Sequence, residues 1–401
     1  MKRLALIAIA LVAASSQAKG DYLRYRVYPQ TMEEASRITN SPLGLFSDDV
    51  RLGETDIYVA PGQLAELWKL RLPYQFVQKI SATYTPPELV DSFDYRNVYL
   101  RYPDIIAQYE EWRTENPGVV ERVQIGRGQP SLNNPIYAYR VFKPQAQDVA
   151  VPPKSIVLTF GIHAREWVSP ACGLHITRKL IDELNAGTSP IAQVLTDNCA
   201  VYVIPVLNPD GYLHTWTSGG RLWRKNRRNN GNGTYGVDLN RNFSIGWGGG
   251  GSSGNTSSET YRGPSAFSEP ETSALRNFCL GLPNLRGFID YHSYAEKILW
   301  PWSYLTSPPP DVSTLSAIAS QMITEMVADG GHTYQHGQGS VALYIASGTT
   351  KDYFYSVHDA ISYTIELRDT GAYGFLLPED QIAGTQDEAW AALKRLILGV
   401  L

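Results

Sequence analysis

Cysteine is scarce in this chain of 401 residues, which has only Cys172, Cys199 and Cys279. A disulfide framework is therefore excluded, because three cysteines form at most one pair, and the sequence does not say which. No two have the Cys-x-x-Cys spacing of a thiolate zinc site. The chain also lacks a large excess of charge of either sign, since its net charge is only −4. That balance gives no indication of a nucleic-acid partner, and stability must come from a core built by the 43% of residues that are hydrophobic.

Long apolar runs are absent beyond the N-terminus, so no membrane span or membrane partner is predicted there. Basic residues at positions 2 and 3 precede the apolar run 4–14, and small residues follow up to position 18. This order is typical of a secretory signal peptide, so residues 1–18 are predicted to be removed and the protein to be extracellular. An uncleaved anchor is the alternative, but the apolar run is short for a bilayer.

Residues 19–90 are predicted to hold a small domain and a linker. Its elements, in the order β-α-β-β-α-β that is typical of ferredoxin-like domains, are expected at 22–28, 31–40, 45–52, 55–60, 61–70 and 74–80. The stretch 81–87 is rich in turn-forming residues and has no helix or strand pattern, which suits an exposed linker. The sequence thus predicts a separate N-terminal unit.

Residues 91–401 are predicted to form the main domain, in which strand and helix patterns alternate. Strands are expected at 119–125, 136–142, 155–160, 200–206, 287–291 and 362–367, and helices at 102–116, 170–184, 269–280, 314–329 and 383–398. Such alternation predicts an α/β fold with a mixed, mainly parallel sheet and helices on both faces. The Gly/Asn/Ser-rich stretch 218–258 is long for a loop, and long loops in compact domains are usually functional.

Two polar residues, His163 and Glu166, follow the strand predicted at 155–160, which is short, apolar and rich in β-branched residues. In open α/β sheets, the carboxyl ends of the strands line the crevice where ligands bind. An imidazole nitrogen and a carboxylate oxygen are ligands that suit zinc. The pair therefore predicts a metal site, with a simple capped strand end as the alternative.

A third protein ligand would leave one open position on a catalytic zinc ion. Among the seven histidines, only His292 ends a strand pattern in the manner of His163. Two histidines and a glutamate from two strand ends are thus the predicted ligand set. Asp238 is a candidate acceptor for the second ring nitrogen of one ligating histidine.

Five motifs then carry a resemblance. They are residues 161–167 (GIHAREW), 222–227 (LWRKNR), 237–243 (VDLNRNF), 291–294 (YHSY) and 366–378 (ELRDTGAYGFLLP). Together they resemble the zinc carboxypeptidases of the pancreatic A/B type, over nearly the whole chain after residue 18. The resemblance implies an eight-stranded sheet and one Zn²⁺ bound by His163, Glu166 and His292. It also implies that Glu366 is the general base and that Arg224 stabilises the oxyanion of the tetrahedral intermediate.

The resemblance also implies a substrate site for the C-termini of peptides and proteins. Arg241 and Asn240 would bind the terminal carboxylate, since a guanidinium offers two parallel donors. Tyr344 would close over the substrate, Arg165 would assist at an outer subsite, and Phe375 would line the cleft. The N-terminal unit would be an activation propeptide, released when an endoprotease cuts the linker; a permanent accessory domain is the alternative. The protein is expected to be a monomer.

Specificity in this family is set by the position seven residues after the lid tyrosine, apolar in the A type and aspartate in the B type. Here that residue is Lys351. A buried cation favours a substrate carboxylate, so we predict a preference for C-terminal Glu, with Asp second because its shorter stem reaches less far. The alternative is that Lys351 turns towards Asp352 or solvent, which would leave an A-type pocket for aliphatic and aromatic residues.

Two departures from the family pattern concern rigidity and activation. The A-type enzymes carry a disulfide across the Gly-rich loop, whereas the stretches around Thr234 and Ser257 have no cysteine. The linker has no strongly basic run, so the activating cut is predicted only to lie between Lys79 and Arg96. A non-catalytic peptide-binding relative would be expected to lack a zinc ligand or the general base, and this chain has all of them.

Overall fold

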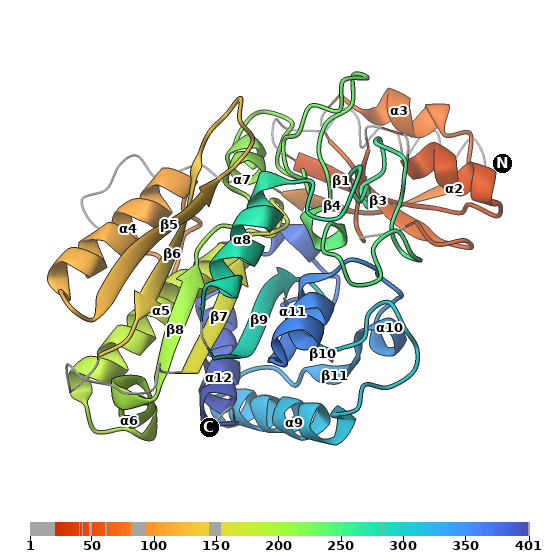
Figure 1. The fold of residues 1–401 in the computed structure, drawn as a ribbon. Helices are drawn as coiled ribbons and strands as arrows, with labels where there is room; N and C mark the ends of the chain where they lie inside the picture. The colour runs from red at the N-terminus through yellow and green to blue at the C-terminus, as the bar shows by residue number, and fades with distance from the viewer. Residues whose placement is uncertain are drawn as a thin grey trace. The chain divides into compact units, whose positions relative to one another are not determined.

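The computed structural model describes residues 21–81, 94–143, 154–282 and 284–399, apart from positions 40, 42, 48, 49 and 61. The predicted signal peptide and nearly all of the predicted linker lie outside these residues. The chain divides into two compact units, one up to Glu88 together with Ser257–Thr260 and one formed by the rest. Each unit has its own sheet (Figure 1).

The first unit has the predicted order of elements. They are β1 (Asp21–Val27), α2 (Met32–Thr39), β2 (Gly44–Leu45), β3 (Thr55–Val59), α3 (Leu64–Lys69) and β4 (Tyr74–Ser81). The sheet order is β2-β3-β1-β4 with antiparallel neighbours. Leu23, Tyr25 and Val27 alternate along β1 and are buried in one core. The strand expected at 45–52 is shorter and spans only Gly44–Leu45.

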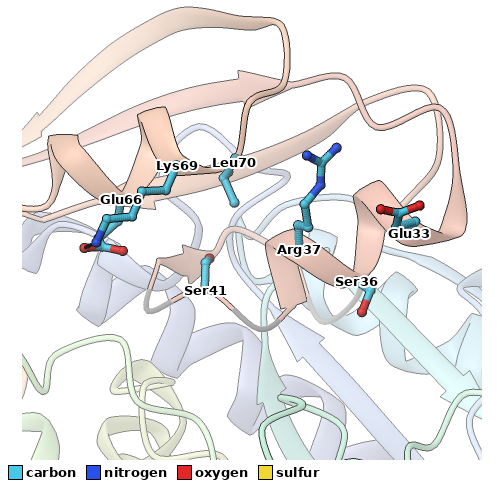
Figure 2. A pocket seen from close by; sticks show the side chains of 7 residues that line it. All are labelled: Glu33, Ser36, Arg37, Ser41, Glu66, Lys69 and Leu70. Atoms are coloured by element: carbon cyan, nitrogen blue, oxygen red, sulfur yellow. Dashed lines mark hydrogen bonds and ion pairs between the residues drawn. The ribbon is translucent and has the colours of Figure 1, made fainter.

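A hollow of about 470 Å³ lies between α2 and α3 of this unit (Figure 2). Its lining residues are Glu33, Ser36, Arg37, Ser41, Glu66, Lys69 and Leu70. Lys69 is paired with Glu66 at 2.6 Å, and Arg37 with Glu34 at 3.4 Å, each pair three residues apart in a helix. Ligand pockets are mostly apolar with a few convergent polar groups, so we assign no ligand to this hollow.

The second unit is built on an eight-stranded mixed sheet, which confirms the predicted fold class (Figure 1). Its strands are β5 (Val120–Arg127), β6 (Pro135–Val141), β7 (Lys154–Phe160), β8 (Cys199–Ile204), β9 (Leu285–Ser293), β10 (Lys297–Trp300), β11 (Gln335–Gln338) and β12 (Ile361–Leu367). They follow the order β11-β10-β12-β9-β7-β8-β6-β5. The four central strands, β12, β9, β7 and β8, are parallel.

Helices cover both faces of this sheet (Figure 1). They are α4 (Tyr102–Glu115), α5 (Val168–Ala186), α6 (Pro190–Asp197), α7 (Pro209–Thr215), α8 (Pro270–Leu280), α9 (Val312–Ala328), α10 (Gly339–Ala342), α11 (Thr350–His358) and α12 (Ile382–Gly399). Side chains of a strand alternate between the two faces of the sheet. Phe160 of β7 packs on Gly173 of α5 on one face. Phe288 of β9 stacks on Phe354 of α11 on the other face, with 3.9 Å between the ring centroids. Central strands buried on both faces are apolar throughout, which is why their pattern was predictable.

Several elements of the second unit were not predicted from the sequence. The edge strands β10 and β11 are short, and β11 has the polar sequence Gln-His-Gly-Gln. Helix α11 carries β-branched and aromatic residues that disfavour helix, and it begins at an N-cap, Thr349, whose side chain accepts from Asp352. All three cysteines are buried and unpaired, so this chain has no disulfide. None of the helices in the described part of the chain has the length and apolar character needed to cross a membrane.

Candidate active site

Two neighbouring parallel strands bring the predicted metal ligands together. Strand β7 ends at Phe160, and the chain turns at Gly161, whose φ is 61°, before His163 and Glu166. Strand β9 pairs with β7 in parallel and carries His292 as its penultimate residue. The three side chains are buried, and one ligand atom from each lies within 4.8 Å of the others.

The hydrogen-bonding geometry fixes which ring nitrogens face the centre. Nδ1 of His163 lies 2.8 Å from Oε1 of Glu166, Nδ1 of His292 lies 3.1 Å from Oε2 of Glu166, and the two Nδ1 atoms are 3.1 Å apart. Each Nε2 atom faces a buried carboxylate, Asp238 at 3.1 Å or Asp290 at 2.9 Å. An N–H that donates to a carboxylate at Nε2 leaves the lone pair of Nδ1 aimed at the centre.

Asp290 is a site residue that sequence analysis missed. Besides its contact with His292, it accepts hydrogen bonds from Thr159 at 2.6 Å and Thr350 at 2.7 Å. The signal that could have found it is the two-residue period of a strand, which places Asp290 and His292 on the same face of β9. The structure thus supplies one carboxylate behind each histidine.

The charged groups of the cluster shift one another's pKa values. Burial raises the pKa of Glu166, but His163 and His292 outweigh this and lower it to about 2. Burial lowers the pKa of His292, but Asp290 and Glu166 outweigh this and raise it well above its usual range. The carboxylates therefore favour a positive charge at the centre, either a proton on His292 or a bound cation in its place.

A buried glutamate and a buried arginine flank this centre. Glu366 lies in β12, and the parallel register places it directly opposite His292. The Arg224 guanidinium is 0% exposed. Its Nε and Nη2 donate to Asp238 at 3.2 and 3.0 Å, and its Nη1 lies 4.0 Å from Glu166. A proton acceptor and a fixed positive charge thus lie beside the metal ligands.

Arg241 and Asn240 follow Asp238 in the short helix η1 (Leu239–Arg241). Nε of Arg241 donates to the carbonyl of Gly251 at 2.7 Å, and Nη1 donates to the carbonyl of Asn240 at 2.9 Å. Its Nη2 makes no hydrogen bond to any residue that the structure describes. The half-buried Tyr344 ring faces the guanidinium, with its centroid 5.9 Å away. Arg241 is therefore held on one side and has donors left on the other.

Arg165 and Phe375 lie together, since the Arg165 guanidinium is 3.9 Å from the centroid of the Phe375 ring. Arg221, which was not predicted, donates to the backbone carbonyls of Arg165 and Phe375 at 2.7 and 2.6 Å. The Tyr294 ring packs edge-on against Phe375 at 5.1 Å. The structure thus brings these two predicted substrate residues into contact.

Lys351 is buried, with 2% of its surface exposed, at the start of α11. Its Nζ donates to the hydroxyl of Ser303, and among the described residues no carboxylate lies within 4.0 Å of it. The neighbouring Asp352 instead accepts from the backbone N–H groups of Ser303 at 2.8 Å and Tyr304 at 3.2 Å. Burial lowers the pKa of Lys351, against the opposing effect of Asp352. The ammonium therefore turns neither to solvent nor to Asp352.

The Gly-rich loop is held by hydrogen bonds where the resemblance led us to look for a disulfide. Asn232 Nδ2 donates to the hydroxyl of Thr256 at 2.9 Å, and Lys225 Nζ donates to the carbonyl of Thr256 at 3.0 Å. These contacts join the two stretches that lack cysteine.

Two imidazole nitrogens and a carboxylate, with a glutamate and an arginine beside them, define a metal-dependent hydrolase site, and this donor set fits zinc with one position open. The sequence profile of the zinc carboxypeptidase family matches residues 105–392. The chain belongs to this family, whose members use one catalytic Zn²⁺, and it is a metallocarboxypeptidase.

Individual relatives agree with this assignment. Carboxypeptidase B of Bos taurus is 37% identical over 76% of this chain and 71% of its own length. Carboxypeptidase A1 of Rattus norvegicus is 36% identical over 79% of this chain and 73% of its own. The crystal structure of thrombin activatable fibrinolysis inhibitor superposes with a TM-score of 0.82 at 30% identity, over 95% of this chain and 99% of that chain.

Proposed function

We propose that this metallocarboxypeptidase removes C-terminal glutamate, and less efficiently aspartate, from peptides and proteins. The observation that carries the proposal is the buried Lys351 ammonium, which has a hydroxyl partner and no carboxylate within ion-pair distance in the described part of the chain. A buried charge without an opposite charge is costly, so a substrate carboxylate that pairs with it gains binding energy. An uncharged side chain of the same size would leave the ammonium unpaired.

The catalytic roles are proposed from the family resemblance, and the positions of the side chains support them. His163, Glu166 and His292 would hold the zinc ion, which lowers the pKa of a bound water and polarises the scissile carbonyl. Glu366, opposite His292 in the register, accepts a proton from the attacking water and delivers it to the leaving amine. Arg224 presents a permanent positive charge to the developing oxyanion, and Asp238 keeps its guanidinium in place.

Recognition of a free C-terminus is assigned to Arg241 and Asn240. The unused Nη2 of Arg241 offers a donor for the terminal carboxylate, while Nε and Nη1 fix the guanidinium. Tyr344 faces this guanidinium and covers the bound residue. Arg165 and Phe375 contact the substrate further from the cut. A clamp for a free carboxylate makes the enzyme an exopeptidase.

The protein is proposed to be a secreted monomeric precursor with a signal peptide at 1–18, a propeptide and linker at 19–90, and a catalytic domain at 91–401. Two observations support this: the N-terminal sequence and the β-α-β-β-α-β order of the first unit, which has its own core. Positions 80–95 contain no Lys or Arg. The flanking basic residues are both in ion pairs, Lys79 with Asp21 at 2.5 Å and Arg96 with Asp387 at 2.8 Å. The activating endoprotease is therefore expected to cut between them.

One experiment tests the whole proposal. A panel of peptides that differ only in the C-terminal residue is incubated with the purified precursor before and after limited proteolysis, with and without a zinc chelator. The trimmed enzyme should release Glu fastest, and the chelator should abolish release. A precursor as active as the trimmed enzyme would contradict the zymogen assignment, and faster release of Phe or Leu than of Glu would contradict the specificity.

A further inference from the structure

Two buried glutamates that the proposed chemistry does not use lie at the N-terminus of α8. Glu269 and Glu271 are both 0% exposed. Asn226 Nδ2 donates to Oε2 of Glu269 at 2.8 Å and to Oε2 of Glu271 at 3.1 Å. Gln129 Nε2 lies 3.3 Å from Oε2 of Glu269 and 3.1 Å from Oε2 of Glu271. Two carboxyl groups therefore share the same two amide donors.

The charged groups that face the pair can neutralise only one carboxylate. Arg228 Nη1 lies 2.8 Å from Oε1 of Glu269, and within the described residues no cation lies within 4.0 Å of Glu271. Asp210, from α7, faces the pair through Gln129, whose backbone N–H donates to it at 2.5 Å. Burial, and then the charge of Glu269, raise the pKa of Glu271 to about 8. At neutral pH Glu271 therefore keeps its proton, beside the ion pair between Glu269 and Arg228.

Asn226 connects this pair to the catalytic arginine. Its Oδ1 accepts from the backbone N–H of Val237 at 2.8 Å, and its own N–H donates to the carbonyl of Val237 at 3.1 Å. The next residue, Asp238, accepts two hydrogen bonds from Arg224. Asn226 is only two residues from Arg224 in the sequence, and its side chain contacts Val237, which is next to Asp238. The Asn226 side chain therefore connects both partners of the Arg224–Asp238 contact to the N-terminus of α8.

We propose that the buried Glu269–Glu271 pair, in which Glu269 has the ion-pair partner, positions Arg224 for catalysis by fixing the side chain of Asn226. The inference rests on the proposed oxyanion role of Arg224. A second negative charge would repel the first in a buried site that holds one cation, and the pair would separate. Asn226 donates to both carboxyl groups, so its displacement would move Val237 and Asp238. The glutamates are positioning residues that do not touch the substrate.

The first test compares kcat and KM of Glu271→Ala, Glu271→Gln and the wild type, from mildly acidic to alkaline pH. Glu271→Ala should lower kcat by about 10- to 100-fold with little change in KM, because a misplacement near 1 Å has an effect of that size. Glu271→Gln should restore kcat and reduce its alkaline decline, since an amide has no proton to lose. Glu325→Gln, which removes a carboxylate paired with Lys394, is the matched control.

Two results would overturn the positioning role: an alkaline decline in Glu271→Gln identical to that of the wild type, or a Glu271→Ala variant that loses stability while kcat is unchanged. If the alanine variant does not fold, the comparison of Glu271→Gln with the wild type still decides. A wild type that releases no residue from any peptide in the presence of zinc would instead contradict the proposed function.

A second test uses stability alone. The pKa of Glu271 is raised to about 8 in the fold, from about 4.3 in an unfolded chain. The folded state therefore binds more protons between these values, and its free energy of unfolding should fall as pH rises through this window. Urea denaturation of the wild type should show this fall, and Glu271→Gln should show less of it. If the free energy of unfolding of the two proteins had the same pH dependence, Glu271 would not be protonated in the fold at neutral pH. This result would contradict the proposal whatever the activity of the variants.

Discussion

The metal centre and the proposed specificity pocket around Lys351 are two buried polar regions of the same unit, and they differ in how their charges are paired. In the metal centre, Glu166 faces both histidines, and each histidine has its own carboxylate. In the specificity pocket, the Lys351 ammonium has a hydroxyl partner, while Asp352 bonds to backbone N–H groups. The first region is complete within the chain apart from its metal, whereas in the second no carboxylate of the described residues lies within 4.0 Å of the ammonium, so a substrate can supply one.

This difference in charge pairing matches the different tasks of catalysing the reaction and selecting the substrate. Groups that carry out the reaction must be held in place before the substrate arrives, so their orientation is fixed by other residues of the chain. A group that selects a substrate gains discrimination when its partner comes from the substrate, because the wrong side chain leaves it unpaired.

The largest effect is expected where the catalytic region loses its proton acceptor. Glu366→Gln should keep the fold and the zinc content and lower kcat by about 1,000-fold or more, since it preserves shape and removes the base. The release of the C-terminal residue gives kcat, and metal analysis of the purified variant gives the zinc content. Glu325→Gln is the control. A variant with near wild-type kcat would show that Glu366 is not the base.

Substitution of Lys351 should change which C-terminal residue is preferred, while the catalytic residues stay unchanged. Lys351→Ile should lower kcat/KM for peptides ending in Glu by about 100- to 1,000-fold or more and raise it for Leu or Phe, since the loss of one partner of a buried pair costs about 3–5 kcal/mol. Lys351→Asp should shift the preference to Lys or Arg. Unchanged ranking of the peptides in both variants would remove Lys351 from the pocket.

A smaller effect is expected from the carboxylate behind His292. Asp290→Asn should weaken zinc binding by about 10- to 100-fold, the usual consequence when the outer partner of a ligating histidine is altered. Competition between the protein and a chromophoric chelator gives the zinc affinity without reference to activity. Asp238→Asn is the parallel variant for His163. Zinc affinity equal to the wild type in Asp290→Asn would mean that Asp290 does not orient the ligand.

The smallest effect is a pH dependence of selectivity. Burial lowers the pKa of Lys351, so its ammonium loses a proton at a lower pH than an exposed lysine. The ratio of kcat/KM for C-terminal Glu to that for Leu should therefore fall as pH rises through the alkaline range. Lys351→Ile should show a flat ratio over the same range. A wild-type ratio that rises with pH would have the wrong sign for this account.

Much of the fold and the metal centre could be predicted because the signals are local. The run at 155–160 predicts β7, and the polar residues just beyond it predict the ligands that β7 and β9 bring together. The β-α-β-β-α-β order of the first unit was likewise predicted from short periodic segments. Each of these inferences needed only neighbouring residues and the rule that parallel strands share an edge.

The rest depends on partners that are distant in the sequence. Asp352 turns away from Lys351 because the backbone of Ser303, 49 residues earlier, donates to it. Thr350, 60 residues after Asp290, bonds to that carboxylate. Helix α11, which carries Thr350 and Lys351, was missed because tertiary packing overrides its weak helix propensity. The predicted signal peptide and linker stay predictions.

The most direct test of the unpaired lysine uses two peptides that differ only in a C-terminal Glu or Gln. The two side chains have nearly the same shape and differ in charge, so the ratio of their kcat/KM values isolates the Lys351 interaction. The account predicts that the trimmed, zinc-loaded enzyme favours Glu over Gln by about 100-fold, and that Lys351→Met removes the difference. Equal rates for the two peptides with the wild-type enzyme would contradict it.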